Sequence, residues 1–386
     1  MRDRLRFRYR INGILVEKLA IPMSFAPSVV SRIKIMSKLK IDEKRIPQDG
    51  RFALKIGDTE VDVRVSTLPI NYGEKIVMRL LKKTGGIAKL DQSGLRGMAY
   101  KSYMEALKAT SGIILITGPT GSGKTQTLAS SLSLVNSERV NIVTLEDPIE
   151  IVVDGINQVQ VNNDAGLTFA SGLRSFLRQD PNIIMVGEIR DQETARLATQ
   201  AALTGHLVFS TIHTNSAAGA LPRLLDMGIE TFLIASTVDT IVAQRLVRVL
   251  CNDCKTVVPA ADSVKIDIKR ILQGVHEFDI DKYIERSAQS AAAHNVALQA
   301  DPNKLYLYQQ VGCTKCNNTG YTGRIGIFEV LKVTQKISQL ILQQRSAEDI
   351  EKCAKDDGML TMIQDGYCKV LDGLTTIEEV LRVIKD

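Results

Sequence analysis

The residues best suited to chemistry in this chain form a glycine-rich loop. Residues 118–125 fit the pattern G-x-x-x-x-G-K-[ST], in which backbone N–H groups wrap phosphate oxygens, the lysine contacts the β- and γ-phosphates and the last hydroxyl ligates Mg²⁺. A chance glycine turn is the alternative, but the apolar run before the loop and the helix-compatible residues after it are the context that the motif requires. We therefore predict a site for ATP and Mg²⁺, with Thr125 as the Mg²⁺ ligand and these nucleotide contacts: Gly118, Pro119, Thr120, Gly121, Ser122, Gly123, Lys124, Thr125 and Gln126.

Hydrolysis also needs a group that orients or deprotonates water, and Glu188 is the candidate. It follows the apolar run 182–187, where a second buried strand delivers an acid beside the phosphates in P-loop ATPases. The aspartate usual just before that glutamate is replaced by Gly187. Glu146, and with it Asp147 and Glu150, could supply further carboxylates to the site, although the latter two could instead cap and brace their loop.

His206 and His213 flank the expected strand at 207–211. A lone histidine is more often structural than catalytic. His213 nevertheless lies at the carboxyl end of the strand, where ligands bind in open α/β sheets, so we predict a role linked to the γ-phosphate for it. His206 lies before the strand and is the weaker candidate.

Arginines in the N-terminal region are candidates for a contribution from outside the P-loop domain. An arginine from another domain or subunit often stabilises charge on a transferred phosphoryl group. In a ring of subunits, Arg51 or Arg64 could reach a neighbour's site, with Arg79 as a further candidate. Ordinary surface ion pairing is the alternative.

Two Cys-x-x-Cys pairs, Cys251/Cys254 and Cys313/Cys316, have the spacing of knuckles that bind Zn²⁺ through four thiolates. The long segment between the pairs weakens a purely pattern-based argument. A redox role is the alternative. Cys353 and Cys368 fall in helix-like sequence and are expected to be ordinary cysteines.

The elements that must position these residues alternate between short apolar runs and helical stretches, which is typical of a largely parallel, doubly wound sheet. Expected strands cover 113–117, 140–145, 183–186 and 207–211, and expected helices cover 168–179, 191–204 and 230–250. The segment 257–305 is interpreted as a helical excursion with loops, and the tail from 335 as short helices.

The first part of the chain has a different pattern. Arginines alternate with apolar residues up to Asn12-Gly13, which predicts a β-hairpin. A helix over 28–39, a turn at 47–51 and strands at 51–56, 61–65 and 72–80, with the first two joined at Gly57-Asp58, complete a small α+β domain. Because a domain rarely begins inside a hairpin, we expect an upstream region to be missing.

The predicted fold class is therefore α/β: a P-loop ATPase domain with a doubly wound sheet, preceded by a small α+β domain and followed by a zinc-binding segment and a helical tail. The expected boundaries are 1–88 for the small domain, 89–94 for a linker, 95–250 for the ATPase core, 251–330 for the tetracysteine segment and 331–386 for the tail.

The composition of the chain narrows the classes of protein to which it can belong. The 386 residues carry 49 Lys and Arg against 43 Asp and Glu, a mild excess that does not argue for a nucleic-acid binder. No apolar run approaches the roughly 18 to 20 residues of a membrane span, and the N-terminus lacks a signal-peptide pattern. The paired cysteines favour metal over disulfides in a reducing compartment, so we expect a cytoplasmic protein.

Together these motifs resemble the motor ATPases of type II secretion and of type IV pilus assembly. The resemblance covers nearly the whole chain and rests on motifs in order: 47–51, 64–67, the P-loop, 146–150 (similar to the family's Asp box), 177–191 (its Walker B region), 204–214 (its His box) and the four cysteines. The tetracysteine segment is similar to that of the assembly and secretion branch.

The resemblance implies that the P-loop domain is RecA-like and that the small α+β domain is PAS-like. It also implies a homo-hexamer with ATP bound between the small domain and the RecA-like domain. It implies Glu188 as general base, Glu146 as a helper, and arginines at positions 51 and 64 reaching the phosphates. The partners would be an inner-membrane platform protein and a membrane-docking protein bound through the missing N-terminal region, at the cytoplasmic face of the inner membrane. The alternative from a different class is a RecA-like nucleic-acid translocase, against which the mild charge and the 5% aromatic content count.

Overall fold

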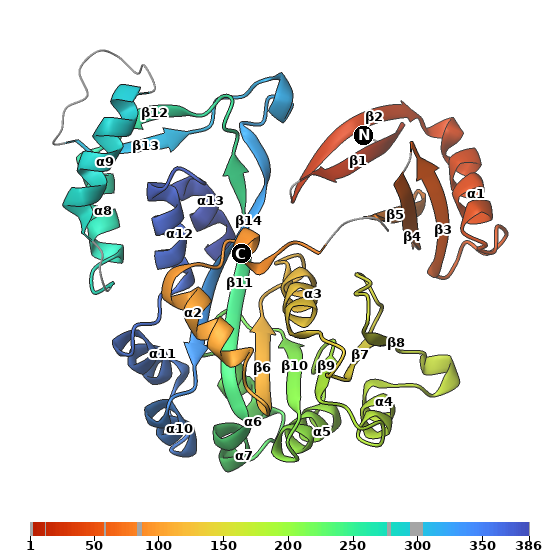
Figure 1. Ribbon diagram of the computed structural model, residues 1–386. Coiled ribbons are helices and arrows are strands. Elements are labelled where there is room, and N and C mark those ends of the chain that lie inside the picture. The colour runs from red at the N-terminus through yellow and green to blue at the C-terminus, as the bar shows by residue number, and fades with distance from the viewer. Residues whose placement is uncertain are drawn as a thin grey trace. The chain divides into compact units, whose positions relative to one another are not determined.

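The chain separates into two compact units, Met1–Ile87 and Ala88–Asp386. A computed structural model describes residues 3–11, 13–57, 59–82, 87–275, 279–293 and 304–385 (Figure 1). Each unit is described by itself. Among the described residues, no helix is both long enough and apolar enough to cross a membrane.

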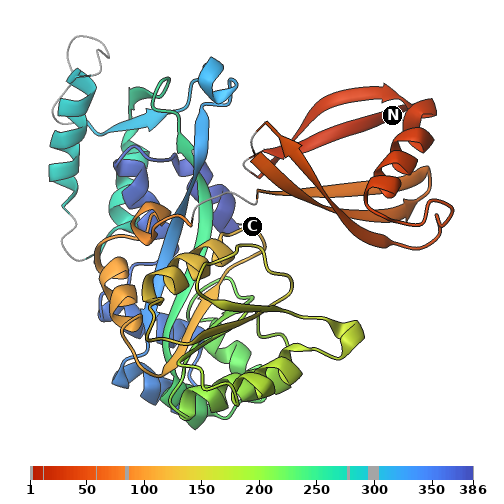
Figure 2. The same ribbon diagram turned by 45° about the vertical axis from the view of Figure 1, so that its right-hand side comes forward.

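Unit 1 combines a hairpin with a small helix-covered sheet (Figure 2). Strands β1 (Arg4–Ile11) and β2 (Ile14–Pro22) pair antiparallel. Helix α1 (Ala26–Met36) is followed by the antiparallel strands β3 (Gln48–Ile56), β4 (Thr59–Ile70) and β5 (Gly73–Lys82). Alternate residues of β4, namely Val61, Val63 and Val65, are buried against Ile33 and Leu39, as the period of a half-buried strand requires.

One expectation for this unit is wrong. Residues 48–51 do not form a turn but begin β3, with Gln48 opposite Thr67 on β4. The glycine that suggested a turn instead allows close packing, since a Cβ on Gly50 would lie 2.5 Å from the carbonyl oxygen of Ser37. Asn12 and Asp58, which belong to two expected turns, lie outside the described residues.

Unit 2 is built on a seven-stranded sheet in the order β14-β11-β6-β10-β9-β7-β8. All pairs are parallel except β11 with β14. This confirms the expected RecA-like arrangement of a largely parallel sheet. The strands are β6 (Gly112–Thr117), β7 (Ile142–Glu146), β8 (Asn157–Gln160), β9 (Ile183–Val186), β10 (Leu207–Ile212), β11 (Val238–Leu250) and β14 (Tyr321–Lys332).

Helices cover both faces of this sheet because its central strands are apolar on both sides. Ile114 and Ile116 of β6 join a hydrophobic cluster that includes residues of α2 (Gly97–Ala106) and α3 (Lys124–Val135). Ile113 and Leu115 join the cluster of the opposite face. That second cluster includes residues of α4 (Phe169–Phe176), α5 (Gln192–Leu203), α6 (Ala220–Asp226), α7 (Thr231–Thr237), α10 (Gln335–Leu342), α11 (Ala347–Asp356), α12 (Met362–Leu371) and α13 (Ile377–Lys385).

Helix ends agree with several local expectations. Asp191 caps α5 by accepting a hydrogen bond from the backbone N–H of Thr194 at 2.8 Å. Ser346 caps α11 through the N–H of Asp349. These caps satisfy backbone donors that the first helical turn leaves unpaired.

The expected helix over 230–250 is wrong beyond its first turns. Helix α7 ends at Thr237, and Val238–Leu250 is strand β11, which pairs with β6 on one side and β14 on the other. A strand buried on both faces gives a continuous apolar run, so periodicity cannot distinguish it from a buried helix. Its many β-branched residues favoured the strand.

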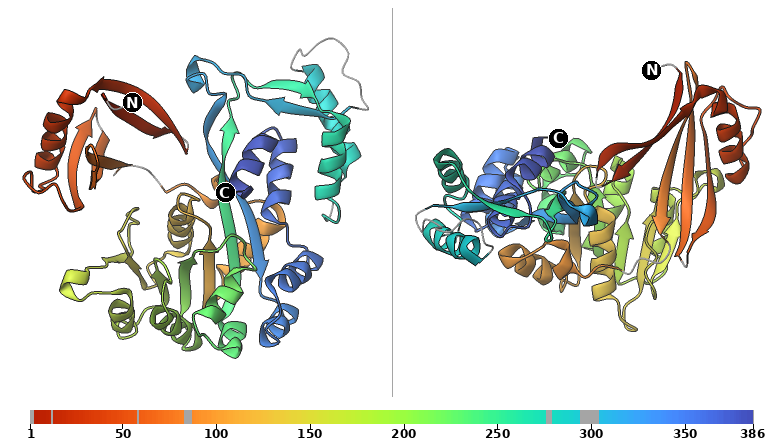
Figure 3. Two further views of the ribbon diagram at one scale, coloured as in Figure 1. Left: turned by 180° about the vertical axis from the view of Figure 1, so that it is seen from behind. Right: turned by 90° about the horizontal axis from the view of Figure 1, so that it is seen from above.

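The segment after β11 carries more strands than expected. Strands β12 (Thr256–Pro259) and β13 (Tyr306–Gln309) pair antiparallel beside α8 (Asp262–Ile271) and α9 (Ile280–Ala293) (Figure 3). The sequence predicts only a helical excursion with loops over 257–305. Strand β14 was not expected either, yet it belongs to the main sheet, and the tail helices share its hydrophobic core. The separation at 250 and 330 stays a prediction.

Candidate nucleotide-binding and catalytic site

The P-loop lies between the carboxyl end of β6 and the first residue of α3, Lys124. Gly118, Gly121 and Gly123 all have positive φ angles, of 143°, 81° and 92°. A Cβ on Gly118 would lie 2.5 Å from the carbonyl oxygen of Gln244. Glycine is therefore required at this position by both backbone conformation and close packing.

Lys124 folds back over the loop. Its Nζ donates hydrogen bonds to the carbonyl oxygens of Gly118 at 2.7 Å and Pro119 at 3.0 Å. Burial lowers the pKa of Lys124, with the charge of Arg245 acting in the same direction and that of Glu188 opposing it. A bound phosphate would give this partly buried ammonium a stronger acceptor than neutral carbonyls.

The residues at the loop fit a nucleoside triphosphate and its Mg²⁺. The positive end of α3 begins at the loop, with Thr125 and Gln126 in its first turn. Ser122 Oγ and Gln244 Oε1 are buried atoms of described residues with no hydrogen-bond partner. A hydroxyl, an ammonium and a glycine-lined cradle are the donors that phosphates and Mg²⁺ require.

Neighbouring strands bring the other candidate groups to the same edge. In the order β6-β10-β9-β7, the carboxyl ends lead to the P-loop, His213, Glu188 and Glu146 respectively. Glu188 makes an ion pair with Arg190 through one carboxylate oxygen, and its other oxygen lies 3.6 Å from Nε2 of His213. The Glu188 side chain is only 15% exposed, so the two partners restrict its position.

A cavity of about 270 Å³ adjoins Glu188, and its lining also includes Ile189, Arg190, Ile212, His213, Arg223 and Met227. The lining combines an acid, a histidine and two arginines. Such a set suits a charged ligand and a water molecule more than an apolar one.

The structure explains the missing aspartate at position 187. A Cβ on Gly187 would lie 3.1 Å from the carbonyl oxygen of Leu145 on the neighbouring strand. Its N–H donates to the same oxygen at 2.8 Å. Close backbone contact between β9 and β7 thus disfavours any side chain here.

Glu146 is buried and held by its neighbours. Its Oε1 accepts hydrogen bonds from Thr144 Oγ1 at 2.7 Å and from Gln158 Nε2 at 2.9 Å. Burial raises the pKa of Glu146, and these two hydrogen bonds act against the rise. Gln158 also donates to Ile151 and accepts from Val153, so it links the carboxylate to the loop that follows β7.

The two histidines differ as expected. His213 directly follows β10 and contacts Glu188. His206 uses Nδ1 to contact the carbonyl oxygen of Ala201 at 2.8 Å and the Thr204 hydroxyl at 3.1 Å. These contacts close the C-terminus of α5, which is a structural role.

The candidate arginines lie in register in unit 1. Arg51 on β3 is opposite Arg64 on β4, which is opposite Arg79 on β5. Directly opposed residues share one face of a sheet. The cluster is on the face away from the buried valines of β4.

The four cysteines meet at one place although a long segment separates the pairs. The Sγ atoms of Cys251, Cys254, Cys313 and Cys316 all lie within 4.8 Å of one another. Backbone N–H groups of Cys313 and Gly320 donate to the Cys316 sulfur. Burial alone would raise the pKa of Cys316, but these donors help to lower it to about 6. The set has the chemistry of a tetrahedral Zn²⁺ site.

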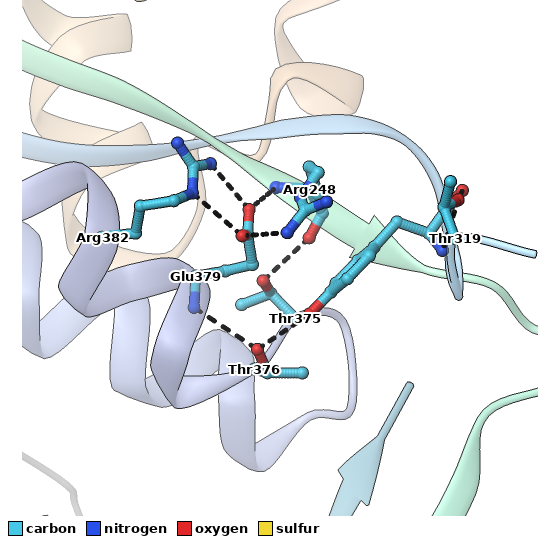
Figure 4. A network of polar contacts seen from close by, with 7 residues as sticks. Arg248, Thr319, Thr375, Thr376, Glu379 and Arg382 are labelled. Atoms are coloured by element: carbon cyan, nitrogen blue, oxygen red, sulfur yellow. Dashed lines mark hydrogen bonds and ion pairs between the residues drawn. The ribbon is translucent and has the colours of Figure 1, made fainter. Parts of the chain in front are cut away.

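A polar network connects the ends of β11 and β14 to α13 (Figure 4). The backbone N–H and the guanidinium of Arg248 both donate to Glu379, which also accepts two hydrogen bonds from Arg382. The Arg248 guanidinium lies over the Tyr321 ring, 4.0 Å from its centroid. Tyr321 in turn contacts Thr376 at 3.2 Å. These contacts fix the last helix to the ends of β11 and β14.

Sequence reasoning missed several residues of the site. Gln244 and Arg245 were assigned to a helix and so were not considered, and Gln158 lay outside every motif. Arg190 lies within the Walker B-like stretch, but the sequence predicts no separate role for it. The available signal is the β-branched content around Gln244, which favours a strand over a helix.

Comparison with known proteins shows that the chain is similar to ATPases of secretion and pilus assembly. A family model described as "Type II/IV secretion system protein" matches residues 1–382. The chain is 46% identical to the type II secretion system ATPase E of Vibrio cholerae serotype O1 over 382 residues, covering 99% of this chain and 70% of that protein. It is 43% identical to the type IV pilus assembly ATPase PilB of Acinetobacter baylyi over 382 residues, covering 99% of this chain and 62% of that protein.

Solved structures show the same fold. The pilus retraction motor PilT with bound ADP matches with a TM-score of 0.61 at 25% identity, covering 100% of this chain and 93% of that one. The ATPase DotB of Legionella pneumophila matches with a TM-score of 0.64 at 20% identity, covering 99% of this chain and 91% of that one.

Proposed function

This chain belongs to the type II/IV secretion system protein family, and we propose that it is an ATP-hydrolysing motor that powers assembly of a type IV pilus or a type II secretion pseudopilus. The predicted family is thereby confirmed. The observation that carries the proposal is the convergence of the P-loop, Glu188, Glu146 and His213 at one edge of the sheet. None of the relatives described above is named as a nucleic-acid motor, so the translocase alternative gains no support.

Each residue at this edge has a role that its position supports. The P-loop N–H groups and Lys124 bind and orient the phosphates. Mg²⁺, held by Thr125 and the phosphates, would neutralise charge on the β- and γ-oxygens. Glu188 orients water and accepts its proton, while Arg190 and His213 hold the two carboxylate oxygens. The buried carboxylate of Glu146 helps from the neighbouring strand.

We assign the arginine row of unit 1 to the phosphates of a neighbouring subunit in a homo-hexamer. The support is the register of Arg51, Arg64 and Arg79, which places three arginines side by side on one face of the sheet. Hydrolysis would change this contact and rotate one unit against the other. The force would act on a platform protein at the cytoplasmic face of the inner membrane.

Substitution of the proposed base tests the catalytic assignment. Glu188→Gln should abolish ATP turnover while it leaves ATP affinity within about twofold, because an amide keeps the shape but cannot accept the proton. Glu193→Gln, on the surface of α5, is the matched control. Unchanged turnover in the Glu188 variant would remove that residue from the role.

Stimulation of the ATPase tests the motor assignment. A cytoplasmic fragment of a pilus or secretion platform protein should accelerate turnover, and single- or double-stranded DNA should not. Strong acceleration by DNA, with no response to the platform fragment, would support the translocase alternative instead.

We further propose that the four cysteines bind one Zn²⁺ per chain. The short Sγ separations and the donors to Cys316 support thiolate coordination. Metal analysis of the purified protein should find about one equivalent of zinc. The double variant Cys254→Ser and Cys316→Ser should lose it, whereas Cys353→Ser should retain it. Zinc in the double variant would contradict the assignment.

A further inference from the structure

Strand β11 extends past the edge at which nucleotide is expected to bind. It runs parallel to β6, with Ala243 opposite Thr117, the last residue of β6. Beyond that pair the chain of β6 turns into the P-loop, whereas β11 continues to Leu250. The residues immediately after Ala243 therefore lie beside the P-loop.

The first of these residues, Gln244, is in direct contact with the loop. Its Nε2 donates to the carbonyl oxygen of Ser122 at 2.9 Å. The backbone carbonyl oxygen of Gln244 occupies the space that a Cβ on Gly118 would need. The side chain is buried. Gln244, the residue before Arg245, thus hydrogen-bonds strand β11 to the P-loop.

Arg245 is buried and connects β11 to the segment after β10. It is only 5% exposed, and its guanidinium donates to Oδ1 of Asn215 at 3.2 Å. Asn215 lies two residues after His213. The same segment is fixed to the end of β6, because the N–H of Thr214 donates to the Thr117 hydroxyl at 2.9 Å.

The charge of Arg245 acts at the P-loop. Burial is the main cause of the lowered pKa of Lys124, the charge of Glu188 opposes it, and the charge of Arg245 is a smaller effect that lowers the pKa further. Two cations at a partly buried site repel each other more strongly than they would in water. A polyanion with its terminal phosphate between them would convert that repulsion into attraction.

We propose that Arg245 is a positioning residue of the nucleotide site, which holds Asn215 in place and adds positive charge beside Lys124 where the terminal phosphate of a nucleoside triphosphate binds. The proposal rests on the nucleotide site proposed above. It gives Arg245 two separable contributions. The charge favours triphosphate over diphosphate, and the contact with Asn215 orders the segment that carries His213.

Measurements of nucleotide binding and ATP turnover on the chain of residues 1–386 separate these two contributions. In Arg245→Gln the affinity for a non-hydrolysable ATP analogue should fall about tenfold, while that for ADP stays within about twofold, since only the terminal phosphate of the triphosphate loses the attraction of this nearby positive charge. Arg245→Lys keeps the charge and should keep the analogue affinity, but its kcat should fall. Asn215→Ala should lower kcat with KM unchanged. Arg382→Gln, on the network of α13, is the control.

The outcomes are distinct. Equal losses for ADP and the analogue in Arg245→Gln would indicate a purely structural role and overturn the proposal. Unchanged affinity and kcat in all three variants would also overturn it. If Arg245→Gln does not fold, the Lys variant and Asn215→Ala still decide the question, because normal kcat in both refutes the contact. A wild-type chain that binds no nucleotide would refute the proposed function as well.

Discussion

Glu379 at the start of α13 offers a quantitative test of the network that fixes this helix to the sheet. Its carboxylate is almost fully buried and accepts hydrogen bonds from Arg248 and Arg382 (Figure 4). Burial alone would raise the pKa of Glu379. The hydrogen bonds from the two arginines outweigh burial and lower the pKa from 4.5 to about 2. The ionised carboxylate is therefore the form that stabilises the fold.

The sign and size of the effect follow from this shift. A carboxyl group with a lowered pKa contributes stability that is complete above pH 4.5 and is lost as the pH falls towards 2. At about 1.4 kcal/mol per unit, the shift corresponds to an upper limit of about 3 kcal/mol. Because Arg382 is 38% exposed, solvent screens part of the interaction. We expect about 2 kcal/mol.

Denaturant unfolding of wild type and Glu379→Gln, from about pH 6 to about pH 3, measures this contribution. The variant should be less stable by about 2 kcal/mol near neutral pH, and the difference should shrink as the pH falls below 4.5. Glu378→Gln, an exposed neighbour, controls for the loss of one acid. A difference that stays constant across this range would refute the electrostatic reasoning, since only packing would then have changed.

Three further substitutions test other parts of the structure. In unit 1, Lys34→Met should lower the free energy of unfolding in urea by about 3 to 5 kcal/mol, because it leaves the carboxylate of Glu74 buried without its 2.6 Å partner. Adding Glu74→Gln should recover most of that loss, and no recovery would argue against an ion-pair effect. Gly187→Ala should lower kcat at least several-fold by separating β9 from β7, and wild-type kcat would show that the strands can adjust. Gln158→Ala removes a hydrogen-bond donor that stabilises ionised Glu146, so the pKa of Glu146 should rise further. The acid limb of the pH–rate profile should therefore move to higher pH. An acid limb that does not move would exclude Glu146 from the titration that controls turnover.

Local sequence signals were sufficient where the chemistry is local. The P-loop could be read directly because its glycines, Lys124 and Thr125 are consecutive, and the strand before it is short and apolar. The same holds for the strand ends at Glu188 and His213, since each functional residue lies within two residues of the end of its own strand. The cap at Asp191 was equally readable.

Contacts between distant segments were not readable in this way. Val238–Leu250 was mistaken for a helix because a strand buried on both faces has no alternating pattern. Gln244 and Arg245 lie in this segment, so the prediction of a helix gave them no place at the nucleotide site. The turn expected at 48–51 failed for a related reason, since Gly50 serves close packing against the chain near Ser37 and not a change of direction.

Local patterns in the sequence predict the nucleotide site, the largely parallel sheet, the candidate base and the family, because these depend on short runs whose backbone conformation local residues dictate. Only the tertiary structure decided which groups meet across strands: Gln158 on Glu146, Arg190 on Glu188, and Arg245 beside the P-loop. It also decided that both Cys-x-x-Cys pairs share one site. The physical reason is that strand order and register, which no local pattern encodes, set the distances between residues far apart in the chain.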